Sequence, residues 1–125
     1  MKRAMFVASA FALSLSASPV FAQDATKVDP KHYKVEFEND QVRVLRVTYG
    51  VKEKSVMHEH PGAVAVFLTD STVKMTGPDG KAVDRPVKAG TAQWTDSTKH
   101  LPENVGDKPF ELVLVELKGK AAAKK

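Results

Sequence analysis

Two histidines separated by a single residue, His58 and His60, carry the clearest metal-binding signal in this sequence. Side chains alternate between the faces of an extended strand, so both imidazoles would point the same way and offer nitrogens to one ion. His100 is the candidate third ligand, and three histidines leave coordination positions open, as catalytic metal sites do. Taken alone, each signal is weak. The pair could equally be two surface histidines on an edge strand, and His100 could be a loop residue bonded to a backbone carbonyl.

The amino-acid composition restricts what else could bind a metal ion. The chain of 125 residues contains no cysteine, which excludes disulfides, thiolate nucleophiles and cysteine-ligated zinc or iron–sulfur sites. A metal ion would have to be held by imidazole, carboxylate or amide groups. Iron, manganese, zinc, nickel and copper all accept imidazole, so the histidines do not select among these divalent ions.

The formal net charge of +4 is concentrated at the ends of the chain. Lys2 and Arg3 lie at the start, and residues 118–125 contain four lysines and no acidic residue. The rest of the chain is slightly acidic. We therefore expect no nucleic-acid binding and no attraction to a membrane surface, because both depend on a basic patch on the folded body.

Residues 1–22 have the composition of a secretory signal peptide. A basic start precedes an apolar, uncharged run over residues 4–15, and Val20-Phe21-Ala22 places small residues where signal peptidase inspects them. The run is shorter than the ~20 residues needed to span a bilayer, which argues against a membrane anchor. We expect cleavage after Ala22, a mature chain beginning at Gln23, and a periplasmic or secreted protein with no membrane anchor.

The mature chain shows the patterns of β-strands and no convincing helix. Apolar and β-branched residues alternate with polar ones, and turn signals such as Gly77-Pro78-Asp79-Gly80 separate the runs. About eight short strands are predicted, over 33–38, 42–49, 56–60, 63–69, 72–76, 82–87, 91–95 and 110–118. Short strands at this spacing are typical of an all-β sandwich, barrel or jelly roll.

The two ends of the mature chain differ from this central domain, which we place at residues 33–118. Residues 23–32 are polar and contain Pro30, so they are expected to be irregular, with His32 at the surface. Residues 119–125 are expected to form a flexible basic tail.

The order of these parts resembles the cupin superfamily over residues 42–117. One cupin motif joins a glycine to an H-x-H pair, and the other joins a glycine to a histidine and, four residues later, an asparagine. The matching residues are Gly50, His58, His60, Gly90, His100 and Asn104. The resemblance implies an RmlC-like jelly-roll β-barrel in which the three histidines converge on a divalent metal ion at the barrel mouth. It also implies a homodimer.

The sequence departs from the cupin pattern at one metal ligand. The family's glutamate would fall at Val64 or Ala65, neither of which binds metal. Gln93 and Glu103 are the nearby polar residues that could replace it, and Glu103 is expected rather to bond backbone or orient a ligand from behind. Without the carboxylate the site would be more positive, which would favour an anionic substrate or a bound hydroxide.

Four further side chains near these motifs are expected to have ordinary structural roles. Glu59 should point away from the two histidines that flank it, toward solvent. Trp94 should fill the core or a pocket wall. Phe67 and Met75 should line the barrel interior.

Three functions remain open from the sequence. The first is an enzyme, a metal-dependent dioxygenase, isomerase or lyase acting on a small molecule, with its catalytic residues unassigned. The second is a non-catalytic periplasmic protein that binds a metal or a small ligand. The third is a structural or sensory cupin without metal. An enzyme should place a general acid or base beside the open metal position, and Glu103 is the one candidate.

Overall fold

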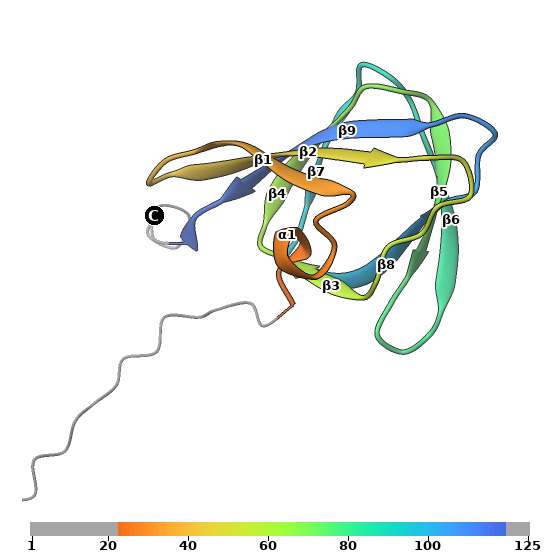
Figure 1. Ribbon diagram of the computed structural model, residues 1–125, viewed down its shortest axis with the longest axis horizontal. Coiled ribbons are helices and arrows are strands. Elements are labelled where there is room, and N and C mark those ends of the chain that lie inside the picture. Colours follow the sequence, from red (N-terminus) through yellow and green to blue (C-terminus); the bar gives the residue numbers. More distant parts are fainter. Residues whose placement is uncertain (1–22, 120–125) are drawn as a thin grey trace, which may run out of the picture.

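The computed structural model describes residues 23–119 (Figure 1). The predicted signal peptide lies outside this range, as does the predicted tail except for Gly119. Between residues 23 and 119, no helix is long and apolar enough to cross a membrane.

The described residues form nine strands and one short helix, which confirms the all-β prediction. The elements are α1 (Ala25–Val28), β1 (Tyr33–Glu38), β2 (Val42–Tyr49), β3 (His58–His60), β4 (Ala63–Phe67), β5 (Ser71–Thr76), β6 (Ala82–Val87), β7 (Ala92–Thr95), β8 (Thr98–Asn104) and β9 (Phe110–Leu117). A five-stranded sheet has the order β1-β2-β9-β4-β7, and a four-stranded sheet has the order β3-β8-β5-β6. The two sheets enclose the core, and strands far apart in sequence, such as β2 and β9, lie side by side (Figure 1).

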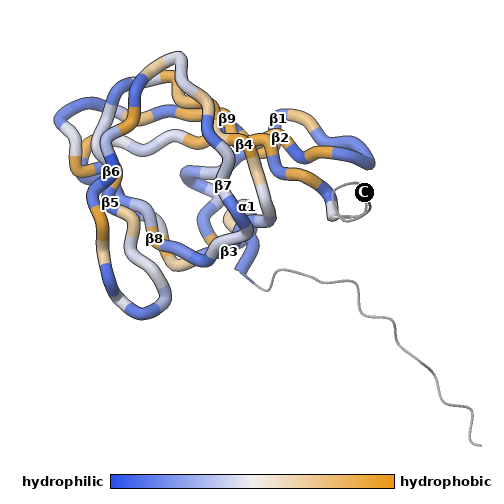
Figure 2. Tube along the Cα trace, turned by 180° about the vertical axis from the view of Figure 1, so that it is seen from behind, coloured by the Kyte–Doolittle hydropathy of each residue, from blue (hydrophilic) through white to orange (hydrophobic). Residues whose placement is uncertain are grey.

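Strand β9 shows how the sequence pattern builds the core. Burial alternates along it, so that Phe110, Leu112, Leu114 and Glu116 point inward. It pairs with β2 on one side and β4 on the other, and long apolar stretches mark this part of the trace in Figure 2. Three of the inward residues extend the apolar core, whereas the fourth, Glu116, is a carboxylate that is only 2% exposed.

Strand β8 was missed by the sequence analysis, which predicted no strand between residues 95 and 110. Pro102 interrupts the stretch and the apolar alternation is weak, so the local strand signal is poor. In the fold, β8 pairs with β3 on one side and β5 on the other. The Pro102 carbonyl also accepts a hydrogen bond from the Ser55 N–H at 2.9 Å. Tertiary pairing therefore outweighs local preference and brings His100 into the sheet.

The sequence analysis predicted that segment 23–32 is irregular. This is wrong, because the segment contains α1. The Asp24 carboxylate caps this helix by accepting a hydrogen bond from the Thr26 N–H at 2.9 Å, and the helix ends two residues before Pro30. The Gln23 carbonyl accepts the N–H of Glu59 at 2.9 Å, which covers the free edge of β3. The N-terminal segment is thus part of the wall around the candidate ligands, and α1 contacts both β1 and β3 (Figure 1).

His32 is buried and not at the surface, which corrects the sequence prediction. It is 5% exposed and stacks on Tyr49, with ring centroids 4.3 Å apart. Its Nδ1 lies 2.8 Å from Asp29 Oδ2, so the imidazole has a polar partner inside the protein. A buried polar ring beside a carboxylate leaves no periodic signature in the sequence, which is why the prediction failed.

Trp94 is exposed and does not fill the core or a pocket wall. It is 53% exposed on β7, an edge strand of the larger sheet. Its neighbour Gln93 lines the internal cavity, so strand alternation directs Trp94 outward. The indole packs over Gly62, where an added Cβ would lie 2.9 Å from the ring.

The turn between β5 and β6 confirms the Gly-Pro-Asp-Gly signal. The Gly80 N–H donates to the Gly77 carbonyl at 3.0 Å, and Gly80 has a φ of 79°, which glycine adopts without steric cost. Most of β6 is exposed to solvent, so this hairpin is the outer wall of the barrel.

Candidate metal centre

The pairing of β3 with β8 brings the three predicted histidines together. His58 and His60 share the inner face of β3, and the register places His100 directly opposite His58. The ring centroid of His58 lies 4.7 Å from that of His60 and 4.9 Å from that of His100. One potential ligand nitrogen from each ring lies within 4.8 Å of the other two.

Hydrogen bonds fix which nitrogen of His58 is free. Its Nδ1 lies 2.8 Å from the Val56 carbonyl oxygen, which can only accept, so Nδ1 carries the proton and Nε2 the lone pair. The same Nδ1 lies 3.1 Å from Ser55 Oγ, which itself donates to Asp29 Oδ2 at 2.5 Å. Two acceptors therefore hold the His58 ring with its Nε2 toward the other histidines.

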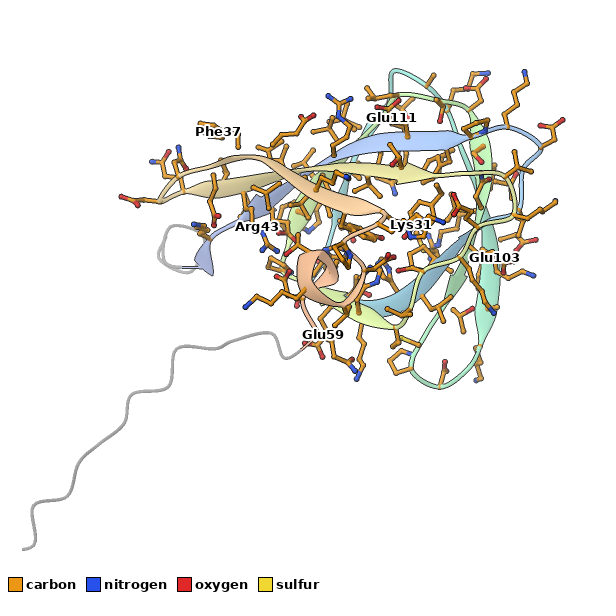
Figure 3. The ribbon with its side chains drawn as sticks, viewed as in Figure 1. Lys31, Phe37, Arg43, Glu59, Glu103 and Glu111 are labelled. Carbon is orange, nitrogen blue, oxygen red and sulfur yellow. The ribbon has the colours of Figure 1, made fainter. Side chains whose placement is uncertain are left out.

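His60 is held by a buried carboxylate. Its Nδ1 donates to Glu116 Oε2 at 2.8 Å, and the other oxygen of Glu116 accepts from Arg43 Nε at 2.6 Å. Arg43 also donates to Asp24 Oδ2 at 2.6 Å, so a chain of charges runs from the N-terminal segment to a candidate metal ligand. Arg43 points from β2 toward α1 in Figure 3. Burial alone would lower the pKa of Arg43, but its bonds to Glu116 and Asp24 raise it.

His100 has no comparable support. None of the described residues accepts or donates a hydrogen bond to its ring, and its Nε2 is buried without a partner. It forms part of the wall of the internal cavity. The third ligand is thus placed by its strand register and by packing alone.

The imidazoles of His58 and His100 are neutral at pH 7. Burial, together with the neighbouring His60, lowers the pKa of His58 from 6.5 to about 4. Burial and the other two histidines lower the pKa of His100 to about 3. A neutral imidazole is the form that binds metal ions, so both rings can ligate without first losing a proton.

These residues fit a divalent metal ion. Nε2 of His58 and Nε2 of His100 are buried and have no hydrogen-bond partner in the described part of the chain. Buried polar atoms without partners are costly and rare, and a metal ion would satisfy both. The zinc–nitrogen distance of roughly 2.0–2.1 Å is reached after small movements of rings that already lie this close.

A cavity of about 250 Å³ opens beside the histidines. His60 and His100 are part of its wall, and most of the remaining wall is apolar, including Phe67 and Met75, as predicted for these two residues. Tyr33 and Tyr49 also line it, with their hydroxyls 2.6 Å apart. Burial raises the pKa of both phenols, so they stay protonated.

Comparison with solved structures places this architecture among known folds. A cupin domain from Bordetella pertussis Tohama I superposes with a TM-score of 0.65 at 22% identity, covering 70% of this chain and 92% of that one. An uncharacterized conserved protein with a double-stranded β-helix domain from Klebsiella pneumoniae gives 0.57 at 18% identity, covering 84% and 94%. An RmlC-like cupin family protein from Methanocaldococcus jannaschii gives 0.53 at 15% identity, covering 71% and 83%.

The chain has the cupin fold. No protein-family model and no curated protein matches its sequence. At these identities the solved structures bear on the fold alone.

The position of the missing cupin glutamate lies in the cavity wall. Ala65 lines the cavity, and Gln93 on the paired strand β7 lies directly opposite it and lines the same cavity. Glu103 lies elsewhere. Strand alternation in β8 sends it to the face opposite His100, and it is not among the residues that line the cavity; Figure 3 labels it near β5 and β6. Of the two residues that could replace the lost carboxylate, only Gln93 faces the cavity.

Glu59 points away from the cavity, as predicted. It lies on the outer side of β3 in Figure 3, and its carboxylate is 4.0 Å from Lys99 Nζ.

Asn104, the last residue of the second cupin motif, has a structural role in this chain. It is 1% exposed, and its amide nitrogen donates to the Gly50 carbonyl at 3.1 Å and the Lys108 carbonyl at 2.8 Å. Its amide oxygen accepts from Ser71 Oγ at 2.8 Å and the Gly106 N–H at 3.0 Å. Asn104 therefore connects the turn that follows β2 to the loop between β8 and β9.

The sequence analysis missed the residues that support the ligands from behind. They are Asp24, Asp29, Ser55 and Glu116. One signal could have found Glu116: it continues the inward-facing alternation of Leu112 and Leu114, so a carboxylate occupies a position that the pattern assigns to the core. The other three lie in segments without periodicity, where no comparable signal exists.

Proposed function

We propose that this protein is an exported cupin that binds one divalent transition-metal ion through His58, His60 and His100, and that it acts on a small organic molecule in the adjoining cavity. The observation that carries the proposal is the pair of buried Nε2 atoms, on His58 and His100, that lack any partner among the described residues and belong to one cluster with His60. Export rests on the predicted signal peptide.

The residues around the ligands have distinct tasks in this proposal. Glu116 and the Val56 carbonyl hold the Nδ1 protons of His60 and His58, which keeps both Nε2 lone pairs available. The apolar cavity wall excludes water from the open side. When bound, the metal would supply Lewis acidity and, for a redox-active ion, one-electron chemistry.

The reaction class follows from what the cavity lacks. Among the described residues that line it there is no carboxylate, and Tyr33 and Tyr49 stay protonated because burial raises their pKa. The wall thus offers no strong general base at neutral pH. This favours oxygenase-type chemistry, which depends chiefly on the metal, over isomerisation by proton transfer. The same lack of a base favours a non-catalytic binding protein as the second candidate.

The test is elemental analysis of the mature chain, residues 23–125, purified without a metal-binding tag. We expect about one equivalent of a transition metal, absent from the His58→Ala/His60→Ala double variant. Glu59→Gln is the matched control, because Glu59 lies between the two histidines and faces outward. A redox-active metal followed by substrate-dependent oxygen consumption would support the oxygenase. Zinc would support the binding role. No metal after purification or reconstitution would contradict the proposal.

A further inference from the structure

Arg85 is the one arginine, and there is no lysine, among the described residues that line the cavity beside the histidines. The described residues that line the cavity include no aspartate and no glutamate. An arginine stays protonated throughout the physiological pH range. The cavity therefore carries a fixed positive charge even without a metal ion.

The sheet register explains why Arg85 faces inward although β6 is exposed. Arg85 pairs with Val73 on β5, and opposed residues of an antiparallel pair direct their side chains to the same face. Val73 is 1% exposed and lines the cavity. Asp84, the neighbour of Arg85, faces the other side by alternation and cannot neutralise it from within. Arg85 both lines the cavity and is exposed to solvent, so it lies where the cavity opens at the edge strand β6.

The other described arginines are both engaged in ion pairs. Arg43 bonds Glu116 and Asp24, and Arg46 bonds Glu36 and Glu111. The structure gives Arg85 no such partner within residues 23–119. A guanidinium at the mouth of an apolar cavity, with its donors free, is suited to bind a carboxylate through two parallel hydrogen bonds.

We infer that the cavity binds a small monocarboxylate, with its carboxylate on Arg85 and its apolar body against Phe67, Met75 and Leu112. The volume of about 250 Å³ is slightly below the ~300 Å³ of the smallest common ligand pockets, so the ligand is small. Arg85 is the one fixed cation among the described lining residues, so the second charge of a dianion would have no partner there. The inference deepens the proposed function, on which it rests for the role of the ligand as a substrate, but the contact with Arg85 does not require the metal.

The test is a calorimetric titration of metal-free mature protein with benzoate, its neutral analogue benzamide, and inorganic phosphate. We expect benzoate to bind the wild type more tightly than either other probe. Arg85→Gln should raise the dissociation constant for benzoate by about ten- to a hundredfold, because one charge-assisted bidentate contact is lost. Arg85→Lys, which keeps the charge and loses the fork, should lie between. Arg46→Gln is the matched control and should leave benzoate binding unchanged.

Two results would overturn the inference. One is that the wild-type protein binds neither benzoate nor the aliphatic carboxylates isobutyrate and 4-methylpentanoate. The other is equal binding of benzoate by wild type and Arg85→Gln. Arg85-dependent binding in a protein that never takes up metal would contradict the proposed function and leave this inference standing. Stoichiometric metal with Arg85-independent carboxylate binding would do the reverse.

Discussion

His58 and His60 on one side of the candidate metal centre are held differently from His100 on the other. Each of the first two has its Nδ1 bonded to an acceptor, the Val56 carbonyl or the Glu116 carboxylate, and both are nearly inaccessible to solvent. His100 has no hydrogen-bond partner among the described residues and forms part of the cavity wall. The comparison indicates that one side of the site is preorganised, while the other is free to adjust to a metal ion or ligand.

The surroundings of the two sides explain the difference. Around His58 and His60, the N-terminal segment and β9 supply acidic residues, β2 supplies Arg43, and the segment before β3 supplies Ser55. Beside His100, β8 leads to β5 and the exposed β6, where the chain offers apolar contacts and Arg85. The preorganised side is thus backed by the N-terminal segment, whereas the adjustable side leads toward β5 and β6; His60 and His100 both line the cavity.

The largest expected effect comes from breaking the support of the preorganised side with Glu116→Ala. This change leaves Arg43 with one partner and His60 with none at Nδ1. Removing one partner of a buried ion pair costs about 3–5 kcal/mol of stability, and removing the support of a metal ligand weakens metal affinity about 10- to 100-fold. Denaturant unfolding and competitive metal titration measure the two effects. Glu116→Gln, which keeps the shape, should lose less of both, and unchanged values for Glu116→Ala would contradict the role given to this network.

Acidification should destabilise the metal-free protein through both sides of the site. The folded pKa values of His58 and His100, about 4 and about 3, lie below the ordinary value of 6.5. Below pH 6.5 the unfolded chain therefore binds more protons than the folded one, and stability falls as pH falls toward the folded values. Each histidine contributes at most about 1.4 kcal/mol per pH unit. Tyr33, which packs against both His58 and His60, stays protonated throughout this window because burial raises its pKa.

The measurement is the free energy of unfolding between pH 7.5 and 5, with chelator present. His100→Gln should reduce the slope of stability against pH below 6.5, because it removes the group with the larger depression of pKa. Glu59→Gln should keep the wild-type slope. If His100→Gln and wild type have parallel profiles, His100 does not reside in the environment described.

A smaller effect is expected for Ser55→Ala, which weakens the support of His58 only in part. The Val56 carbonyl still accepts the Nδ1 proton of His58, but the buried Asp29 carboxylate loses the hydroxyl that donates to it at 2.5 Å. Asp29 keeps its bond to His32, so the change removes one hydrogen bond to a charged group, which is worth about 1.5–3 kcal/mol. Metal affinity should fall less than in Glu116→Ala. The same unfolding and titration experiments rank the two variants, and the opposite ranking would show that His58 depends on Ser55 more than His60 depends on Glu116.

The sequence predicted the histidine cluster better than it predicted the residues that support it. An H-x-H pair reports its own geometry, because alternation puts His58 and His60 on one face whatever surrounds them. His100 was a weak candidate by itself and was supported by the resemblance to a cupin motif, although its strand was missed because Pro102 weakens the local pattern. His32 and Ser55 lie in aperiodic segments, so their burial depends on contacts between distant residues that no local pattern encodes.

The smallest effect is expected for Glu103→Gln, which tests the adjustable side of the site. The sequence made Glu103 a candidate to replace the lost glutamate or to orient a ligand. In the fold it lies two strand positions from Leu101 on the face opposite His100, and it pairs across the sheet with Lys74. Since it touches neither the cavity nor a histidine, metal affinity and stability should stay within about twofold and about 0.5 kcal/mol of wild type. Gln93→Ala provides the contrast, because Gln93 faces the cavity. Competitive metal titration of both variants shows which of the two residues affects metal binding. If Glu103→Gln lowers metal affinity more than Gln93→Ala does, Glu103 supports the site and the description of His100 as unsupported is wrong.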